Sequence, residues 1–139
     1  MSKITYDANL LKLMTLFETV TRSRVKDCFT DDNELLTFVV NDFQLGKAVG
    51  KGASNVKKLE NMLKRKIKIL GFNPNPVQFI KNLIYPVKAE VEFNDNIVQI
   101  KVNDSKSKAF LFGRNRVNLN NNLKITNKYF KEIKAIKIV

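Results

Sequence analysis

The chain has 139 residues, 44% of them apolar, and a formal net charge of +12, so it can bury one medium core or two small ones. It has a single cysteine and no histidine, and it carries neither a Walker-type loop nor paired carboxylates in an apolar setting, so we expect no enzyme, metal site or cofactor. No apolar run approaches the roughly 20 residues of a membrane span, and Met1–Thr5 lacks the apolar stretch of a signal peptide, so we expect a cytoplasmic protein without a membrane partner.

The first half of the chain predicts a mixed α+β unit. Apolar residues at helical spacing follow Asp7, a suitable N-cap, and a turn-forming acidic stretch separates two apolar strands. Cys28 falls in the first of these strands and is interpreted as a small core residue. The predicted elements are a helix at 8–22, strands at 25–30 and 35–40, a short helix at 43–49, a helix at 54–65 and a strand at 66–72.

The second half predicts the same order of elements after a boundary at Asn73-Pro74-Asn75-Pro76, where two prolines stop regular structure. Its asparagine-rich second long helix is poor in helix propensity and has Val117, Leu119 and Leu123 as apolar anchors. The predicted elements are a helix at 77–85 led by Pro76, strands at 87–93 and 98–102, a short helix at 107–112, a helix at 117–129 and a strand at 133–139.

An internal repeat links the two halves. Val40-Asn41-Asp42 precedes Gly50 much as Val102-Asn103-Asp104 precedes Gly113, with an offset of 62 residues at the Asn-Asp pairs and 63 at the glycines. A repeat of this kind indicates two copies of one unit. We therefore predict two domains, 1–73 and 74–139, that pack together.

Positive charge is concentrated around the two glycines. Residues 45–70 and 105–139 hold 8 and 9 basic residues with one acidic residue each, a net charge of +15, whereas the remaining residues sum to −3. This asymmetry is typical of a protein that binds a polyanion. A lysine-rich solvated surface is the alternative, but it would not by itself keep acidic residues away from the turns.

Each glycine opens a turn that leads into a helix. Such a turn presents backbone N–H groups at a positive helix end, a combination that favours phosphate. The sequence therefore points first to a nucleic-acid backbone. The two turns read Gly50-Lys51-Gly52-Ala53-Ser54-Asn55 and Gly113-Arg114-Asn115-Arg116-Val117-Asn118.

These residues resemble a known family over almost the whole chain. The order of elements is that of a type II KH domain, with Val49-Gly50-Lys51-Gly52-Ala53 and Phe112-Gly113-Arg114-Asn115-Arg116 in the place of its apolar-GxxG loop. The pair of copies resembles archaeal NusA, a family of transcription termination and antitermination factors. Further resemblance lies in Val25-Lys26-Asp27-Cys28, Phe38-Val39-Val40, Asn55-Val56-Lys57-Lys58-Leu59-Glu60 and Phe79-Ile80-Lys81-Asn82-Leu83.

The resemblance implies a protein that binds single-stranded RNA, with each loop clamping the backbone of about four nucleotides. RNA polymerase is a further expected partner, and a monomer is the expected state. By this interpretation Lys51 and Arg114 supply mobile charge, while Lys57 and Lys58 reach flanking phosphates or form an ordinary solvated face. The predicted RNA-binding residues are Gly50, Lys51, Gly52, Ala53, Ser54, Asn55, Lys57, Lys58, Gly113, Arg114, Asn115, Arg116 and Asn118.

Both loops depart from the family pattern at the fourth position, where Ala53 and Arg116 replace glycine. Ala53 is small, but Arg116 either adds a phosphate contact or marks a second copy that has become structural. The competing hypothesis for the whole chain is a scaffold that docks on RNA polymerase or a ribosomal particle without gripping single strands.

Overall fold

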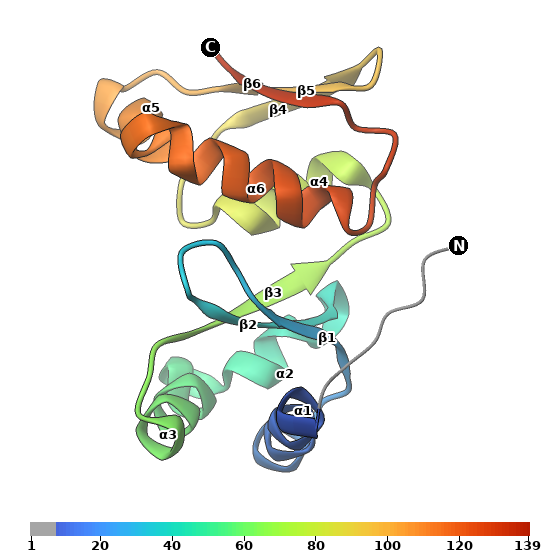
Figure 1. Ribbon diagram of the computed structural model, residues 1–139, viewed down its shortest axis with the longest axis vertical. Coiled ribbons are helices and arrows are strands. Elements are labelled where there is room, and N and C mark those ends of the chain that lie inside the picture. The colour runs from blue at the N-terminus through green and yellow to red at the C-terminus, as the bar shows by residue number, and fades with distance from the viewer. Residues whose placement is uncertain (1–7) are drawn as a thin grey trace. The chain divides into compact units, whose positions relative to one another are not determined.

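The structure is a computed structural model that describes residues 8–139, so the predicted N-cap Asp7 lies outside the described residues. The chain divides into two compact units, one ending at Phe72 and the other running from Asn73 to Val139 (Figure 1). Each unit is a helix, a hairpin, two helices joined by a glycine turn, and a last strand.

In the first unit the sheet has the order β1-β2-β3, with β1 antiparallel and β3 parallel to the central strand. A parallel neighbour needs a crossover, and here the crossover contains the glycine turn. The elements are α1 (Ala8–Thr21), β1 (Val25–Thr30), β2 (Leu36–Asn41), the 3₁₀ turn η1 (Asp42–Gln44), α2 (Leu45–Val49), the 3₁₀ turn η2 (Lys51–Ala53), α3 (Ser54–Leu63) and β3 (Ile67–Phe72).

The first core lies between the sheet and its helices, which share one side of it in Figure 1. Phe17 of α1 stacks on Phe38 of β2 with ring centroids 4.5 Å apart. Leu59 brings α3 onto the same cluster, and Cys28 is buried in it as expected. Met62, near the end of α3, is 49% exposed.

The second unit repeats this topology, with sheet order β4-β5-β6 and β6 parallel to β5. Left-handed backbone at Asp95 and Asn96 forms the tight turn between β4 and β5. The elements are α4 (Pro76–Ile84), β4 (Glu90–Asn94), β5 (Ile97–Lys101), α5 (Ser105–Phe112), the 3₁₀ turn η3 (Arg114–Arg116), α6 (Val117–Asn127) and β6 (Ala135–Ile138).

The predicted strand at 87–93 is wrong in its first half, because β4 begins only at Glu90. The backbone N–H of Val87 donates to the carbonyl of Ile84 at 2.9 Å and closes the turn after α4, so it is used outside the sheet. Residues 87–89 alternate like a strand, but they belong to the connection.

The second core gathers aromatic side chains, with Phe79 of α4 5.6 Å from Tyr129 and 5.3 Å from Phe130 between ring centroids. The predicted anchors of α6 are partly wrong, because Val117 is 41% exposed and the buried residues of this helix are Asn121, Ile125 and Thr126. The Thr126 hydroxyl donates to the carbonyl of Asn122 at 2.7 Å, which allows a polar side chain to be buried.

The predicted α+β class with two KH-like units is confirmed by the two matching three-stranded sheets and their helices.

Candidate nucleic-acid interface

The first glycine turn has a backbone that most residues avoid. Gly50 adopts φ 81° and ψ 161°, a region populated almost only by glycine, and Gly52 and Ala53 follow with left-handed φ values of 61° and 60°. Two hydrogen bonds close the turn: Gly50 N–H donates to the Gly46 carbonyl at 3.0 Å, and Ala53 N–H donates to the Gly50 carbonyl at 3.0 Å. The chain then enters α3 at Ser54.

The second turn has the same conformation with different side chains. Gly113 adopts φ 70° and ψ 172°, and Asn115 and Arg116 have φ values of 54° and 62°. Gly113 N–H donates to the Ala109 carbonyl at 2.9 Å, and Arg116 N–H donates to the Gly113 carbonyl at 3.2 Å, so both bonds of the first turn recur 63 residues later. The backbone of the second loop has therefore kept the geometry of the first.

The leading glycines are required for space as well as for conformation. A Cβ on Gly50 would lie 2.6 Å from Ser54 Oγ and 3.0 Å from the backbone nitrogen of Asn55. A Cβ on Gly113 would lie 2.8 Å from the backbone nitrogen of Asn118. Gly52 differs, because a Cβ there would meet nothing within 4 Å.

An asparagine braces each turn. The Asn55 side-chain amide donates to the Lys47 carbonyl at 3.2 Å, and the Asn118 amide donates to the Phe110 carbonyl at 2.8 Å. In both units the donor lies five residues after the leading glycine and the acceptor three residues before it. The amides thus tie the end of one helix to the start of the next, which is a positioning role that the sequence interpretation missed; the matched Asn spacing was the available signal.

The helices that follow the two turns begin without a side-chain cap. Ala53 and Arg116 are the N-cap residues of α3 and α6, and neither makes a side-chain capping hydrogen bond. By contrast, Asn75 caps α4 by accepting from Val77 N–H at 2.9 Å, and Asp104 caps α5 by accepting from Ser107 N–H at 2.8 Å.

The first N–H groups of a helix have no acceptor within it, and they need a side chain, water or a ligand. At α4 and α5 the side-chain oxygen of the N-cap residue satisfies this need. At α5 the hydrogen bonding from Ser107 also lowers the pKa of the Asp104 carboxyl. At α3 and α6 the cap residue supplies no such oxygen, and only the first N–H of each helix, that of Ser54 or Val117, donates to a carbonyl of the preceding 3₁₀ turn. An external anion can accept from the N–H groups that follow.

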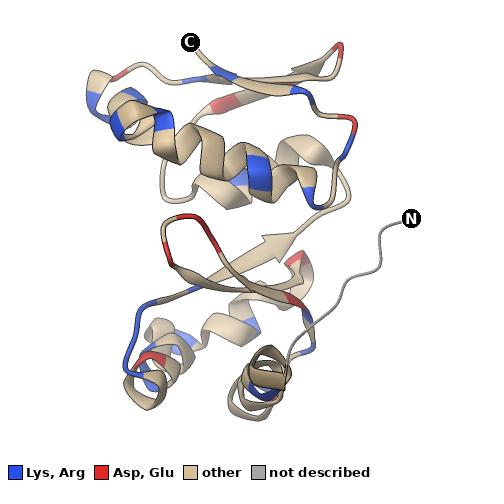
Figure 2. Ribbon diagram, viewed as in Figure 1, with Lys and Arg blue, Asp and Glu red and all other residues tan. Residues whose placement is uncertain are grey.

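The charged residues at the two turns are open to solvent. Lys and Arg occur at the α5–α6 end of the second unit and around α3, whereas acidic residues gather at the β1–β2 turn (Figure 2). No acidic residue occurs in the first turn of α3 or α6. The exposed members of the predicted set are Lys51, Gly52, Ser54, Lys57, Lys58, Arg114, Asn115 and Arg116, while Gly50, Ala53, Asn55, Gly113 and Asn118 are half-buried.

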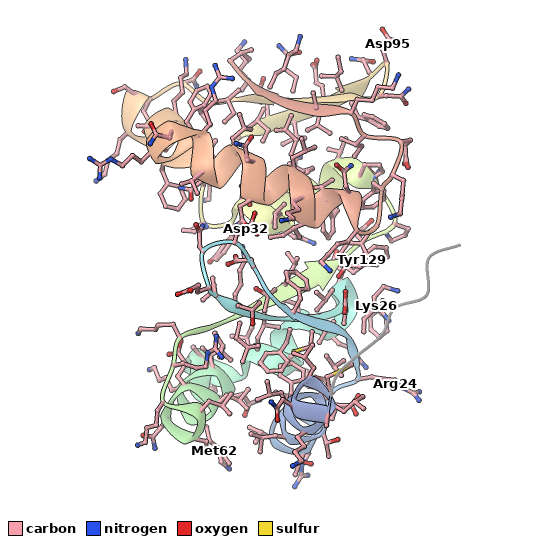
Figure 3. The ribbon with its side chains drawn as sticks, viewed as in Figure 1. Arg24, Lys26, Asp32, Met62, Asp95 and Tyr129 are labelled. Carbon is pink, nitrogen blue, oxygen red and sulfur yellow. The ribbon has the colours of Figure 1, made fainter. Side chains whose placement is uncertain are left out.

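Other features of the described residues offer less chemistry. Burial raises the pKa of the Cys28 thiol to about 12, which makes it a poor nucleophile. Within residues 8–139 no group of three His, Cys, Asp or Glu is placed to hold a metal ion, and no helix there is long and apolar enough to cross a membrane. Lys26, labelled in Figure 3, lies over the ring of Phe72 with its Nζ 4.5 Å from the centroid, so this cation already has a partner in the fold.

A shallow hollow lies on the sheet of the second unit, lined by Glu90, Glu92, Gln99 and Lys101. Gln99 and Lys101 are exposed on β5, and Glu92 and Glu90 pair with them across the strands. Mixed charge makes this hollow a poorer phosphate site than either glycine turn.

The fold and the two turns define the class of the protein, a pair of KH-like units. A solved structure has a similar fold. The crystal structure of APE1850 matches with a TM-score of 0.72 and 24% sequence identity, covering 96% of this chain and 100% of that chain. No protein-family model matches the chain.

The sequence relatives are archaeal proteins, each named probable transcription termination protein NusA. The protein of Methanococcus vannielii is 33% identical over 103 residues, covering 70% of this chain and 59% of that protein. The protein of Methanocaldococcus jannaschii is 28% identical across 100% of this chain and 77% of that protein. The protein of Halobacterium salinarum is 27% identical over 122 residues. The resemblance to archaeal NusA is confirmed, while the matched region spans less than two thirds of the first relative.

Proposed function

We propose that this protein is a transcription termination factor of the NusA type that binds single-stranded RNA through its two glycine turns. The names of the archaeal relatives support the role in transcription. The observation that carries RNA binding is the pair of uncapped helix starts, α3 and α6, each preceded by an exposed cationic turn. Backbone N–H groups and a positive helix end attract phosphate, and a paired arrangement suits a polymer of phosphates.

In the first turn, the absence of a side chain at the exposed Gly52 lets a phosphate approach the backbone, and Lys51 adds an exposed charge beside it. Gly50 contributes by allowing the start of α3 to pack closely against the turn. The Ser54 N–H already donates to the Lys51 carbonyl, so the N–H groups in the first turn of the helix from Asn55 onward are proposed to bind the phosphate oxygens. Asn55 also braces the turn through its amide.

Lys57 and Lys58 are exposed one turn further along α3 and are proposed to contact flanking phosphates. The second turn is proposed to act in the same way, with Arg114 in the place of Lys51. Asn115 occupies the position of Gly52, and Arg116 that of Ala53. Arginine binds phosphate oxygens through a planar fork of donors, so Arg114 and Arg116 give this turn more potential contacts than the first. Asn118 braces this turn as Asn55 braces the other.

The test is fluorescence-anisotropy titration of a mixed-sequence single-stranded RNA against three double variants with the same change of charge. Lys51→Asp with Gly52→Asp alters the first turn, and Arg114→Asp with Asn115→Asp alters the second. Asn9→Asp with Lys12→Asp places the same charge change on exposed positions of α1 as the control. Asp tolerates the left-handed conformation at positions 52 and 115, so the fold is expected to survive.

We expect each turn variant to weaken binding by at least tenfold and to flatten the salt dependence. The slope of log K against log salt changes by about 0.7 for each phosphate of a single strand that the protein no longer neutralises. The control should alter the affinity much less. Equal losses of affinity in all three variants would show that net charge alone, and not the turns, determines binding, which would contradict the proposal. Unchanged affinity in both turn variants would overturn it in favour of a scaffold that docks on RNA polymerase or a ribosomal particle.

A further inference from the structure

The flanks of the two turns differ in chemistry at equivalent positions. An offset of 63 residues, which superposes the leading glycines, places Phe110 opposite Lys47 and Val117 opposite Ser54. Phe110 is 60% exposed and Val117 is 41% exposed. The second turn therefore has apolar side chains open to solvent on both flanks, where the first has polar ones.

The position of Phe110 is set by the bracing asparagine. Its carbonyl accepts from the Asn118 amide at 2.8 Å, as the Lys47 carbonyl accepts from Asn55 at 3.2 Å. Residue 110 is thus held against the start of α6, one helical turn before Gly113. The backbone of this exposed residue is therefore tied to the same helix start that is proposed to bind phosphate.

The surrounding charge favours a ligand that is anionic as well as aromatic. From Ser105 to Asn127 the chain contains five basic and no acidic residues. An apolar protein partner would gain little from this charge. A single-stranded nucleic acid presents a phosphate and a base within one nucleotide, which matches a cationic turn with a phenyl ring at its edge.

We propose that Phe110 stacks an unpaired RNA base next to the phosphate held by the second turn, so that the second unit grips base and backbone while Lys47 gives the first unit only a further charge. This inference rests on the proposed function and deepens it. Stacking on an aromatic side chain is tolerant of sequence, because every base has a π face. Removing the ring is expected to weaken binding by about 5- to 150-fold.

The first experiment uses tryptophan fluorescence, since the chain contains no tryptophan. The variant Phe110→Trp keeps an aromatic ring for stacking and introduces the only indole. Leu11→Trp is the matched control, because Leu11 is 51% exposed and lies on α1 in the other unit. Saturating single-stranded RNA should quench the indole of F110W strongly and that of L11W little. Equal quenching in the two variants, or none in F110W, would contradict the stacking.

The second experiment separates stacking from charge. Phe110→Ala and Phe110→Leu should lower affinity with an unchanged salt slope, because every phosphate stays neutralised, whereas Arg114→Ala should flatten the slope. If the wild-type protein binds no RNA, both this inference and the proposed function fail. If it binds RNA and the turn variants lose affinity while F110A does not, the stacking alone is wrong.

Discussion

The two turns of this chain have the same backbone conformation but almost none of the same side chains. Both have a glycine with ψ near 180°, two left-handed residues, the same pair of closing hydrogen bonds and a bracing asparagine. Between the glycine and the helix, however, Lys-Gly-Ala in one corresponds to Arg-Asn-Arg in the other. The comparison teaches that the leading glycine and the asparagine specify the turn, while the residues between them are open to change.

The comparison also bears on strain. Ala53 and Arg116 are both left-handed, at a cost of about 1 to 2 kcal/mol for a residue with a Cβ. Strain of this kind persists where a site requires the conformation. Because both copies retain it with unlike residues, the conformation itself is the common feature.

The largest effect is expected from alanine at the leading glycines. Gly113→Ala and Gly50→Ala combine a forbidden conformation with overlap onto α6 or α3, so each should lower the free energy of unfolding of its unit by about 3 kcal/mol. Gly113→Ala should be the more costly, since its Cβ would lie closer to backbone nitrogen. Urea denaturation followed by circular dichroism measures both.

Gly52→Ala is the matched control, with open space around the new Cβ, and should cost only about 1 kcal/mol. Equal losses for all three variants would show that conformation alone, without the close approach to the helix, makes these glycines necessary.

Alkaline pH should weaken the first unit in particular, because it contains the single thiol. Burial raises the pKa of Cys28 to about 12 from an ordinary 9.0, so the folded state holds the proton more tightly. The protonated thiol contributes its full stabilisation below pH 9, and this stabilisation is lost as the pH rises toward 12. The loss should reach about 2 kcal/mol near pH 10.5. Cys28→Ala removes this contribution, so the difference between wild type and C28A should shrink as the pH rises.

The rate at which a thiol reagent labels Cys28 reports how often the first unit opens, and so tests whether a change in one turn affects only its own unit. Modification requires opening of the first unit, since the side chain is 1% exposed. Gly50→Ala should speed labelling, and Gly113→Ala should speed it less. Equal acceleration would show that the two units open together.

Loss of a bracing asparagine should have a smaller effect, about 1 kcal/mol for one hydrogen bond. Asn118→Ala is expected to cost more than Asn55→Ala, because its bond to the preceding helix is 2.8 Å long rather than 3.2 Å. Thermal unfolding of the two variants tests the order. The reverse order would place the difference between the units elsewhere than in this bond.

Much of the fold could be predicted because hydrophobic periodicity survives in nearly every element. The prediction failed at residues 87–89, which alternate like a strand but whose Val87 N–H donates to a turn carbonyl and not to a neighbouring strand. It failed again in α6, where Asn121 is buried, because periodicity cannot tell which polar side chains find partners. The predicted packing of the two units on each other stays a prediction.

The glycines were enough to locate the candidate site in the sequence. The backbone conformation of the second turn could not be predicted from them. Asn115 and Arg116 share no residue type with Gly52 and Ala53, yet they adopt the same left-handed backbone. Which polar group braces the turn depends on contacts eight residues apart, between Asn118 and Phe110 in this copy, and single-residue preferences do not reveal them.

The smallest effect, and the one that separates the turns most finely, concerns their fourth position. Glycine relieves the left-handed strain of Ala53 or Arg116 but adds disorder to the unfolded chain, so Ala53→Gly and Arg116→Gly should each stabilise by about 0.5 kcal/mol. RNA affinity should then diverge: A53G leaves binding unchanged, whereas R116G weakens it and flattens the salt slope by about 0.7 if Arg116 contacts a phosphate. Titration of both variants over a salt series measures the divergence. An R116G protein that is more stable and binds RNA as before would mean that this arginine is only a tolerated departure from glycine, and that the second turn relies on Arg114 and the helix start for its charge.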